Sequence, residues 1–357
     1  MRRALALARL GWGQTAPNPM VGAVVVAGET VVGEGFHARY GEAHAERAAL
    51  GDAGNSARGA TLYVTLEPCA HHGKTPPCTE AVIAAGIARV VVAIRDPTPQ
   101  ARGGAEALRA AGIRVDIGLE RDAAAELNAS FFAAQCLRRP WVTLKLAVSA
   151  DGGIAADGAR RWITGSEARA ETHRQRANAD AVGAGVGTIL SDDPALTVRG
   201  VTPARVPPRR AVFDRQLRTP LDAQVVRTAR EVPTIIVGGV RAGESRQGLA
   251  LTEAGAQVLS TSSLGDALRQ LRGGGVQSLY LEGGARIAGA FVSDRLVDRL
   301  IIFRSPVVLG SSALQAFAFA PPEFQSLLAE RRVVERRAFG DDDMTIYALE
   351  DVPCLPD

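Results

Sequence analysis

Short apolar runs alternate with amphipathic stretches along the whole chain. In the first 138 residues, two apolar runs around a Gly-Glu turn predict a hairpin over 21–27 and 30–35. Further strands are expected at 61–66, 89–94 and 113–118, and helices at 2–9, 44–50, 78–85, 101–111 and 123–137. Strands that alternate with helices indicate an α/β layered domain.

The Arg-Arg-Pro sequence at 138–140 marks a boundary, because proline disfavours helix in the residue before it. The alternation then resumes, and 199–208 is expected to be an exposed loop. Strands are predicted at 141–148, 179–182, 210–214, 234–237, 278–281, 300–306 and 345–349, and helices at 166–178, 265–271 and 285–291. We therefore predict two domains, 1–140 and 141–357, which agrees with the length of 357 residues.

Composition narrows the class of protein. A hydrophobic fraction of 46% excludes a disordered chain, and no apolar run approaches the ~18 residues of a membrane span. The N-terminus lacks a signal-peptide pattern, so we expect a cytoplasmic protein. A net charge of +3 and 5% aromatic residues speak against nucleic-acid binding. Four cysteines do not make a disulfide framework, and Cys136 and Cys354 are expected to be ordinary buried residues.

The most specific chemical signal is His44-Ala45-Glu46, followed by Pro68-Cys69 and Cys78. One imidazole and two thiolates are typical ligands of a catalytic zinc that keeps its fourth position for water. Residues two apart on a helix lie about 200° apart around its axis. His44 and Glu46 therefore face one pocket only if His44 stands at the start of the helix. Cys78 precedes a predicted helix, whose N-terminal field favours a thiolate.

Two other interpretations of these residues are open. The cysteines are then either ordinary buried residues or part of a closed structural zinc site with His71 or His72 as the fourth ligand. Glu46 argues against both, because a structural site has no use for an acid beside the metal.

The arrangement resembles the cytidine-deaminase superfamily, whose signature is H-x-E followed by P-C-x-x-C. Here eight residues, not two, separate Cys69 from Cys78. Residues 65–78, Thr-Leu-Glu-Pro-Cys-Ala-His-His-Gly-Lys-Thr-Pro-Pro-Cys, are similar to the deaminase half of the bifunctional riboflavin-biosynthesis deaminase/reductases. Residues 17–22, Pro-Asn-Pro-Met-Val-Gly, are similar to the same half.

The resemblance implies zinc-hydroxide deamination of 2,5-diamino-6-ribosylamino-4(3H)-pyrimidinone 5′-phosphate, which releases the 2-amino group as ammonia. It implies that Zn²⁺ is bound by His44, Cys69 and Cys78. Glu46 is implied to be the catalytic residue that takes the proton of the water and delivers it to the ring and the leaving amine.

Four further residues fall on positions that resemble the family's substrate contacts: Asn18, His37, His71 and Lys74. Lys74 would suit the 5′-phosphate. The residues alone also allow Asn18 to hold a turn between two prolines, and His37 and His71 to lie at the surface or behind the substrate contacts.

The second half contains several distinctive segments. These are Ser-Ala-Asp-Gly at 149–152, Trp-Ile-Thr at 162–164, Gly-Ala-Gly-Val-Gly-Thr at 183–188, Asp-Asp-Pro-Ala-Leu-Thr-Val-Arg at 192–199 and Leu-Glu-Gly-Gly at 281–284. Glycines before a helix let a phosphate approach backbone N–H groups, although a plain turn explains them equally well. The cluster at 183–188 does not follow G-x-G-x-x-G, so a Rossmann fingerprint is not supported.

Together these segments resemble the reductase half of the same family, which has a dihydrofolate-reductase-like α/β fold and uses NADPH to reduce the ribosyl group to ribityl. The first half correspondingly resembles a cytidine-deaminase-like α/β/α domain. The resemblance implies substrate contacts at Lys145, Arg176, Arg199 and Glu282. It implies cofactor contacts at Ala147, Trp162, Thr188, Asp192, Gly284, Ala285, Arg286, Ile287, Ala288, Gly289 and Ala290. From the residues alone, Asp192 and Asp193 also suit a helix cap or turn before Pro194.

Two departures from the family pattern affect these expectations. Arg160 stands where relatives often carry Ser beside the substrate, and Arg215 stands where a small polar residue lines the cofactor site. Arg215 would suit the 2′-phosphate of NADPH. Lys74 and Lys145 are the chain's two lysines, against 39 arginines. A compact ammonium enters narrow pockets that a planar guanidinium does not fit, which favours a site role for both.

We therefore expect a bifunctional riboflavin-biosynthesis enzyme that acts on a small-molecule substrate and binds neither nucleic acid nor membrane. A homo-oligomer is expected from the family precedent. One alternative keeps the zinc deaminase and gives the reductase another pyrimidine or pteridine. The other alternative is a zinc-stabilised nucleic-acid-binding module, which salt-dependent nucleic-acid affinity would reveal.

Overall fold

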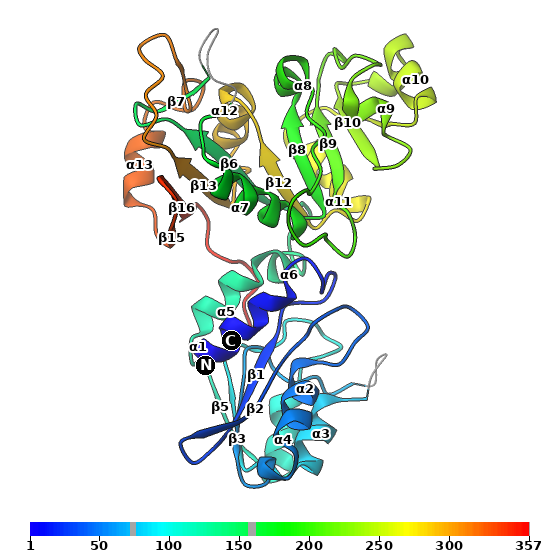
Figure 1. Cartoon of the computed structure of the whole chain (residues 1–357). Coiled ribbons are helices and arrows are strands. Elements are labelled where there is room, and N and C mark those ends of the chain that lie inside the picture. The colour runs from blue at the N-terminus through cyan, green and yellow to red at the C-terminus, as the bar shows by residue number, and fades with distance from the viewer. Residues whose placement is uncertain (72–75, 156–161, 357) are drawn as a thin grey trace. The chain divides into compact units, whose positions relative to one another are not determined.

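The computed structural model describes residues 1–71, 76–155 and 162–356, which form two compact units (Figure 1). The first unit comprises Met1–Leu137 and the C-terminal tail Val352–Asp357, and the second comprises Arg138–Asp351. The tail, which the predicted division assigned to the second domain, thus packs with the first unit.

The first unit is a five-stranded sheet with helices on both faces (Figure 1). Its strand order is β2-β1-β3-β4-β5, with an antiparallel β1–β2 hairpin, β1 antiparallel to β3, and parallel pairing from β3 to β5. The strands are β1 Gly22–Ala27, β2 Thr30–Phe36, β3 Thr61–Val64, β4 Arg89–Val92 and β5 Arg114–Ile117. The helices are α1 Arg2–Ala8, α2 Ala45–Ala53, α3 Cys78–Ala84, α4 Gly104–Ala110, α5 Arg121–Leu127 and α6 Ala129–Ala133.

Glycines on the sheet allow two helices to approach it closely. A Cβ at Gly22 of β1 would collide with backbone atoms of Ala4 and Ala8 in α1, and one at Gly35 of β2 would collide with the backbone of α2. Helix α2 carries Glu46 and starts directly after His44, so this close packing sets the position of both functional side chains.

The helix predicted over 123–137 is interrupted at Asn128, which leaves the helical backbone conformation at φ −117°. Its side-chain oxygen accepts the N–H of Met20 at 2.8 Å, and its amide donates to the Met20 carbonyl at 2.9 Å. This reciprocal pair ties the junction of the two helices to the segment before β1. The break separates α5 from α6, which carries Phe131.

The second unit is built on a nine-stranded sheet in the order β11-β10-β9-β8-β12-β6-β13-β16-β15. Pairing is parallel from β11 to β13, and β16 and β15 add antiparallel strands at one edge. The strands are β6 Trp141–Val148, β8 Ala181–Gly185, β9 Arg209–Phe213, β10 Thr234–Gly238, β11 Gln257–Ser260, β12 Ser278–Glu282, β13 Arg299–Arg304, β15 Val333–Phe339 and β16 Asp342–Ala348. A separate pair joins β7 Gly153–Ala155 and β14 Leu314–Gln315.

The helices of the second unit follow the parallel strands. They are α7 Ser166–Ala177, α8 Val186–Asp192, α9 Gln224–Arg227, α10 Arg246–Glu253, α11 Leu264–Gly273, α12 Ala285–Ser293 and α13 Phe324–Glu330. All seven strands predicted for this half are present, whereas short or weakly patterned elements such as α8, β11 and β15 were not predicted. No helix among the described residues is long and apolar enough to span a bilayer.

The expectation for Cys136 and Cys354 is wrong. The two residues form a disulfide across 218 positions of sequence, and Cys136 is exposed just after α6. Arg121 also donates to the carbonyl of Pro356 at 2.7 Å. The C-terminal tail is therefore fastened to the α5–α6 region of the first unit.

Candidate active sites

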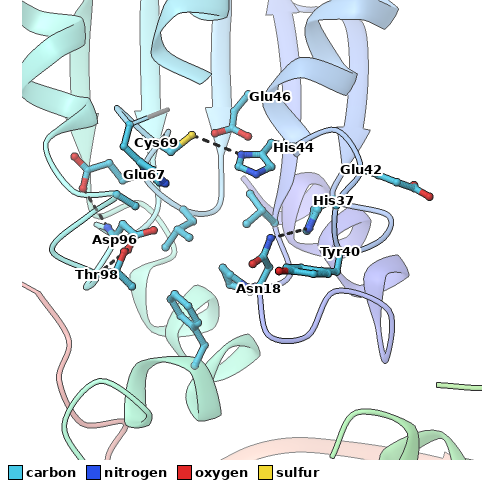
Figure 2. A pocket seen from close by; sticks show the side chains of 17 residues that line it. Asn18, His37, Tyr40, Glu42, His44, Glu46, Glu67, Cys69, Asp96 and Thr98 are labelled. Carbon is cyan, nitrogen blue, oxygen red and sulfur yellow. Dashed lines mark hydrogen bonds between the residues drawn. The ribbon is translucent and has the colours of Figure 1, made fainter. Parts of the chain in front are cut away.

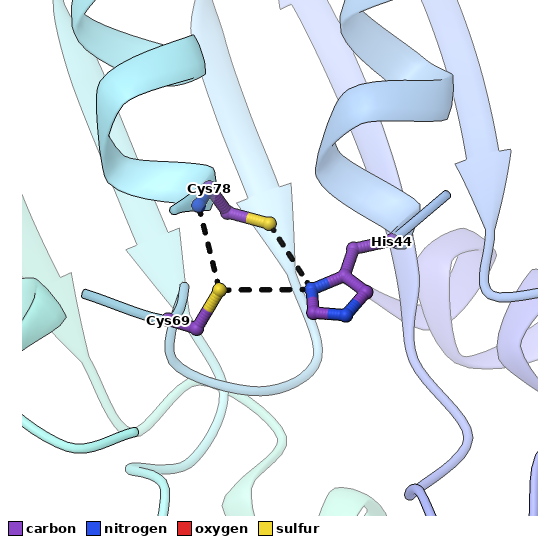
Figure 3. Close-up of side chains that lie close together, drawn as sticks. All are labelled: His44, Cys69 and Cys78. Atoms are coloured by element: carbon purple, nitrogen blue, oxygen red, sulfur yellow. Dashed lines mark hydrogen bonds between the residues drawn. The ribbon is translucent and has the colours of Figure 1, made fainter. Parts of the chain in front are cut away.

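The three predicted metal ligands converge between the starts of two helices (Figure 3). His44 is the N-cap of α2, Cys78 is the first residue of α3, and Cys69 lies in the loop after β3. Nδ1 of His44 is 3.3 Å from Sγ of Cys78 and 3.6 Å from Sγ of Cys69. The backbone N–H of Cys78 also donates to Sγ of Cys69 at 3.4 Å.

These distances fit a tetrahedral zinc ion. Zn–S and Zn–N bonds of about 2.3 and 2.0–2.1 Å place a nitrogen and a sulfur ligand about 3.6 Å apart. The charges fit as well. The hydrogen bond with Cys78 lowers the pKa of the Cys69 thiol to about 4, whereas the hydrogen bond with Cys69 raises that of Cys78. The negative charge of one thiolate thus hinders deprotonation of the other thiol, and a bound cation would stabilise both thiolates.

Glu46 faces the same pocket as His44, as the sequence required of a helix that starts at His44. Because His44 precedes α2, Glu46 falls in the first turn of the helix and lines the same cavity. Its side chain is buried, and burial raises the pKa of its carboxyl to about 7. A group with that pKa can both accept and donate a proton near neutral pH.

The cavity beside the metal ligands has a volume of about 300 Å³ (Figure 2). Asn18 and His37 line it together, with Nδ2 of Asn18 3.3 Å from Nε2 of His37. Nδ1 of His37 lies 3.1 Å from the carbonyl of Ala43, so this ring nitrogen is the donor. Burial lowers the pKa of His37. His37 therefore does not lie at the surface. Asn18 lines the cavity and also takes part in a turn, since its N–H donates to the carbonyl of Thr15 at 2.9 Å.

His71 also lines the cavity, beside the metal ligands. Within the described ranges, the cluster of possible ligands comprises His44, Cys69 and Cys78 and does not include His71. Lys74 and His72 lie outside the described residues.

Sequence reasoning missed most of the cavity wall, including Tyr40, Glu67, Asp96, Thr98 and Phe131. Figure 2 shows Tyr40 beside Asn18 and His37, while Asp96 and Thr98 lie across the cavity from them. Asp96 follows β4, and residues beyond the carboxyl ends of parallel strands commonly face the ligand. That rule would have found Asp96, whereas nothing in the pattern around Phe131 signals its place.

In the second unit, three predicted substrate contacts form a chain of charges. Nε and Nη2 of Arg176 on α7 donate to both carboxylate oxygens of Glu282 on β12. Lys145 on β6 stands opposite Glu282 in the parallel register. Burial lowers the pKa of Lys145, and the Nζ atom lies 5.8 Å from the ring centre of Phe303. Arg176 lowers the pKa of Glu282 against the effect of its burial.

Arg199, the fourth predicted contact, is exposed, and its backbone lies near this chain of charges. Nη1 of Arg176 donates to the carbonyl of Thr197 at 2.8 Å. The N–H of Arg199 donates to Nδ1 of His173 at 3.2 Å.

The predicted cofactor contacts gather at the carboxyl ends of three adjacent strands, β8, β12 and β6. Ala147 lies near the end of β6, Thr188 lies in α8 after β8, and Gly284 is the N-cap of α12 after β12. A Cβ at Gly284 would meet no atom within 4 Å, so there is open space beside the start of α12, and a helix start is where backbone N–H groups bind anions. This cradle fits the pyrophosphate of a dinucleotide.

The remaining positions are more widely spread. Within 284–290, Ala288 is fully buried in the core, and Gly289 packs against Phe319. Asp192 is exposed at the end of α8. Trp162 is also exposed, with the Arg169 guanidinium 5.1 Å from its ring centre.

Two departures from the family pattern were singled out. Arg160 lies outside the described residues. Arg215 is exposed directly beyond the end of β9, and its carbonyl accepts the N–H of Gly239 at 3.0 Å.

Family models match both halves of the chain. The cytidine and deoxycytidylate deaminase zinc-binding region matches residues 1–94, and the RibD C-terminal domain matches residues 140–342. The riboflavin biosynthesis protein RibD of Aquifex aeolicus is 46% identical over 314 residues, which are 87% of each chain. Its counterpart in Escherichia coli is 41% identical over 338 residues, which are 88% of each chain.

Solved structures agree with these matches. RibD of Acinetobacter baumannii superposes with a TM-score of 0.80 at 37% identity over 97% of each chain. A diaminohydroxyphosphoribosylaminopyrimidine deaminase/5-amino-6-(5-phosphoribosylamino)uracil reductase of Thermotoga maritima superposes with a TM-score of 0.82 at 34% identity, over 98% of this chain and 97% of that one.

The predicted fold class, a deaminase-like domain and a RibD-type reductase domain, is confirmed by these matches. They do not favour a nucleic-acid-binding module or a reductase for another pyrimidine or pteridine. The chain belongs to the RibD family, the bifunctional enzymes of riboflavin biosynthesis that join a zinc-dependent deaminase to an NADPH-dependent reductase.

Proposed function

We propose that this chain deaminates 2,5-diamino-6-ribosylamino-4(3H)-pyrimidinone 5′-phosphate in its first unit. We propose that the second unit then reduces the ribosyl group of the product to give 5-amino-6-ribitylamino-uracil 5′-phosphate. The observation that carries the proposal is the convergence of His44, Cys69 and Cys78 beside the buried acid Glu46. The activity ascribed to the Thermotoga maritima relative agrees with it.

In the deaminase site, His44, Cys69 and Cys78 would hold zinc, which supplies the Lewis acidity that activates water near neutral pH. Glu46 takes one proton from the attacking water and passes it to a ring nitrogen. It then takes the second proton from the resulting hydroxyl group and gives it to the amine, which leaves as ammonia. Its pKa of about 7 suits both directions of transfer.

Substrate recognition in the deaminase is assigned to side chains around the cavity. Asn18 and His37 donate and accept hydrogen bonds along the edge of the pyrimidine, and their mutual contact at 3.3 Å orients both. His71 lies near the ligands in the same cavity. Lys74 is proposed to bind the 5′-phosphate.

In the reductase site, Lys145 is proposed to contact the sugar. Opening of the ribosyl ring leaves a C1′=N imine, and hydride at C1′ with a proton at nitrogen gives the ribitylamino group. Glu282 opposes the lowering of the Lys145 pKa by burial, and Arg176 in turn lowers the pKa of Glu282. Arg176 and Arg199 bring positive charge to the substrate phosphate. The carboxylate between the cations orders them and limits their repulsion.

NADPH supplies hydride to this site. We propose that the N–H groups at the start of α12, from Gly284 to Ile287, bind its pyrophosphate, with Ala288, Gly289 and Ala290 continuing that helix behind them. Ala147, Trp162, Thr188 and Asp192 are proposed as further contacts. Arg215, beyond the end of β9, is proposed to bind the 2′-phosphate.

The test is incubation with the diaminopyrimidine phosphate, with and without NADPH, with ammonia release and NADPH oxidation followed separately. We expect ammonia without NADPH, and NADPH oxidation only after deamination. NADPH oxidation with no ammonia, or neither reaction, would refute the proposal.

We also propose that the chain is a cytoplasmic homo-oligomer without a nucleic-acid partner. Phosphorylated substrate and NADPH are intracellular metabolites, and the net charge of +3 is low for nucleic-acid binding. Each sheet has edge strands, such as β2 and β15, that are open to pairing. Light scattering during size-exclusion chromatography would test the assembly, and a monomer at micromolar concentration would contradict it.

A further inference from the structure

The segment 197–199 is held from one side by helix α7. His173 and Arg176 lie one turn apart on that helix. Arg176 donates to the Thr197 carbonyl at 2.8 Å, and Nδ1 of His173 accepts the N–H of Arg199 at 3.2 Å. Each end of the short segment is therefore bound to a different side chain of one helix.

The segment leaves the protein core just before these contacts. Leu196 is 2% exposed, has a positive φ of 50° and packs in the cluster around β8, β9 and β10. Arg199, three residues later, is exposed. Thr197 and Val198 are only partly buried, so the bond to His173 helps to set where the exposed Arg199 side chain begins.

We propose that His173 is a positioning residue of the reductase, which holds the Arg199 backbone so that the guanidinium faces the substrate. The inference rests on the proposed role of Arg199 as a substrate contact. His173 itself need not touch the substrate, and its action depends on an unprotonated Nδ1 that can accept a hydrogen bond.

The surroundings favour that neutral form. Burial lowers the pKa of His173, and the charges of Arg176 on α7 and Arg199 on the held segment lower it further. Glu282 on β12 and the Thr197 carbonyl act in the opposite direction. Two nitrogens of Arg176 already donate hydrogen bonds to Glu282. Their positive charge partly offsets the rise in the pKa of His173 that Glu282 causes.

Protonation would reverse the bond. A protonated Nδ1 has no lone pair for the Arg199 N–H and becomes a donor, for which the Thr197 carbonyl is the neighbouring acceptor. The Arg199 N–H would then lose its acceptor on α7. The KM of the reductase substrate is expected to rise as pH falls through the pKa of His173, while deamination does not depend on this residue.

Two variants separate these roles. His173→Ala removes the acceptor, and His173→Asn keeps an oxygen near the position of Nδ1 but cannot titrate. Gln175→Ala on the same helix is the matched control, since Gln175 bonds to Glu171 and not to the segment. For each variant, reductase KM and kcat are measured on pre-deaminated substrate between pH 5.5 and 7.5. Affinity for the ribityl product is measured by calorimetry without NADPH.

We expect His173→Ala to raise KM about three- to tenfold, the equivalent of one hydrogen bond, with kcat within about twofold. His173→Asn is expected to restore KM near neutral pH and to flatten its rise at low pH. The substrate phosphate titrates in the same range, so only the difference between wild type and His173→Asn counts.

An unchanged KM in His173→Ala, or the same low-pH rise in His173→Asn as in wild type, would overturn the inference. A fall in kcat alone would overturn it too, because it would indicate a role in chemistry. If His173→Ala fails to fold, the pH profile of His173→Asn decides. Failure of the proposed function is distinct: wild type would then not oxidise NADPH with this substrate at all.

Discussion

The buried carboxylate of Glu67 joins three parts of the deaminase unit. Glu67 lies two residues before Cys69, and its side chain is fully buried. One oxygen accepts the N–H of Asp96 at 3.1 Å, and the other accepts the N–H of Ala105 in α4 at 2.8 Å. We predict that Glu67→Gln disturbs both the stability of the unit and the cavity wall that Asp96 forms.

The size of the expected loss in stability follows from the two backbone N–H groups that donate to Glu67. A glutamine side chain has one oxygen and one NH₂ group, so it satisfies one N–H and turns a donor toward the other. Leaving a buried N–H unpaired costs about 1–3 kcal/mol, and the remaining bond loses its charge assistance, about 1 kcal/mol more. A loss of about 2–4 kcal/mol corresponds to at least about 4 °C in Tm for a unit of this size.

Differential scanning calorimetry of the full chain measures this loss, and added NADPH identifies the reductase transition by stabilising it. Glu106→Gln is the matched control, because it makes the same change on α4 at an exposed site. Glu106 pairs with Arg95 at 2.8 Å, and such surface pairs contribute within about 1 kcal/mol. Zinc content and the KM for deamination are measured alongside. If Glu67→Gln matched Glu106→Gln in Tm and KM, the reasoning would be refuted.

Four further outcomes are expected. Cys78→Ala should hold less than one zinc per chain by atomic absorption and release no ammonia, and full zinc occupancy would contradict the ligand assignment. Glu46→Gln should keep zinc but lose about 10²–10⁴-fold in deamination, with NADPH oxidation on pre-deaminated substrate unchanged; loss of zinc would make Glu46 a ligand instead. Burial lowers the pKa of Lys145, so its ammonium group loses the proton at a pH below 10.5, the ordinary pKa of lysine. The alkaline limb of reductase kcat/KM should therefore begin below that pH and vanish in Lys145→Arg, and a limb that persists there belongs to another group. Lys74→Arg should raise the KM for deamination and leave reduction intact, since an arginine fork is wider than an ammonium; an unchanged KM would contradict the lysine argument.

The sequence by itself determined the elements and the metal chemistry. Apolar runs and period-two patterns located the five strands of the first sheet and seven of the nine strands of the second, because such a pattern reports burial and needs no knowledge of the partner. His44, Glu46, Cys69 and Cys78 lie within a short stretch of chain, and their spacing relative to the predicted helix starts was sufficient to bring them together. The pattern required that His44 begin its helix, and His44 is the N-cap of α2.

Only the tertiary structure decided which distant residues meet. Phe131 reaches the cavity because Asn128 exchanges hydrogen bonds with Met20 across 108 positions. Cys136 meets Cys354 across 218 positions. Local periodicity carries no information about such pairs, since a side chain's burial does not reveal which residue covers it. The same holds for His173 and Arg199, where a helix side chain accepts the backbone N–H of an exposed residue and leaves no trace in the pattern of apolar and polar residues.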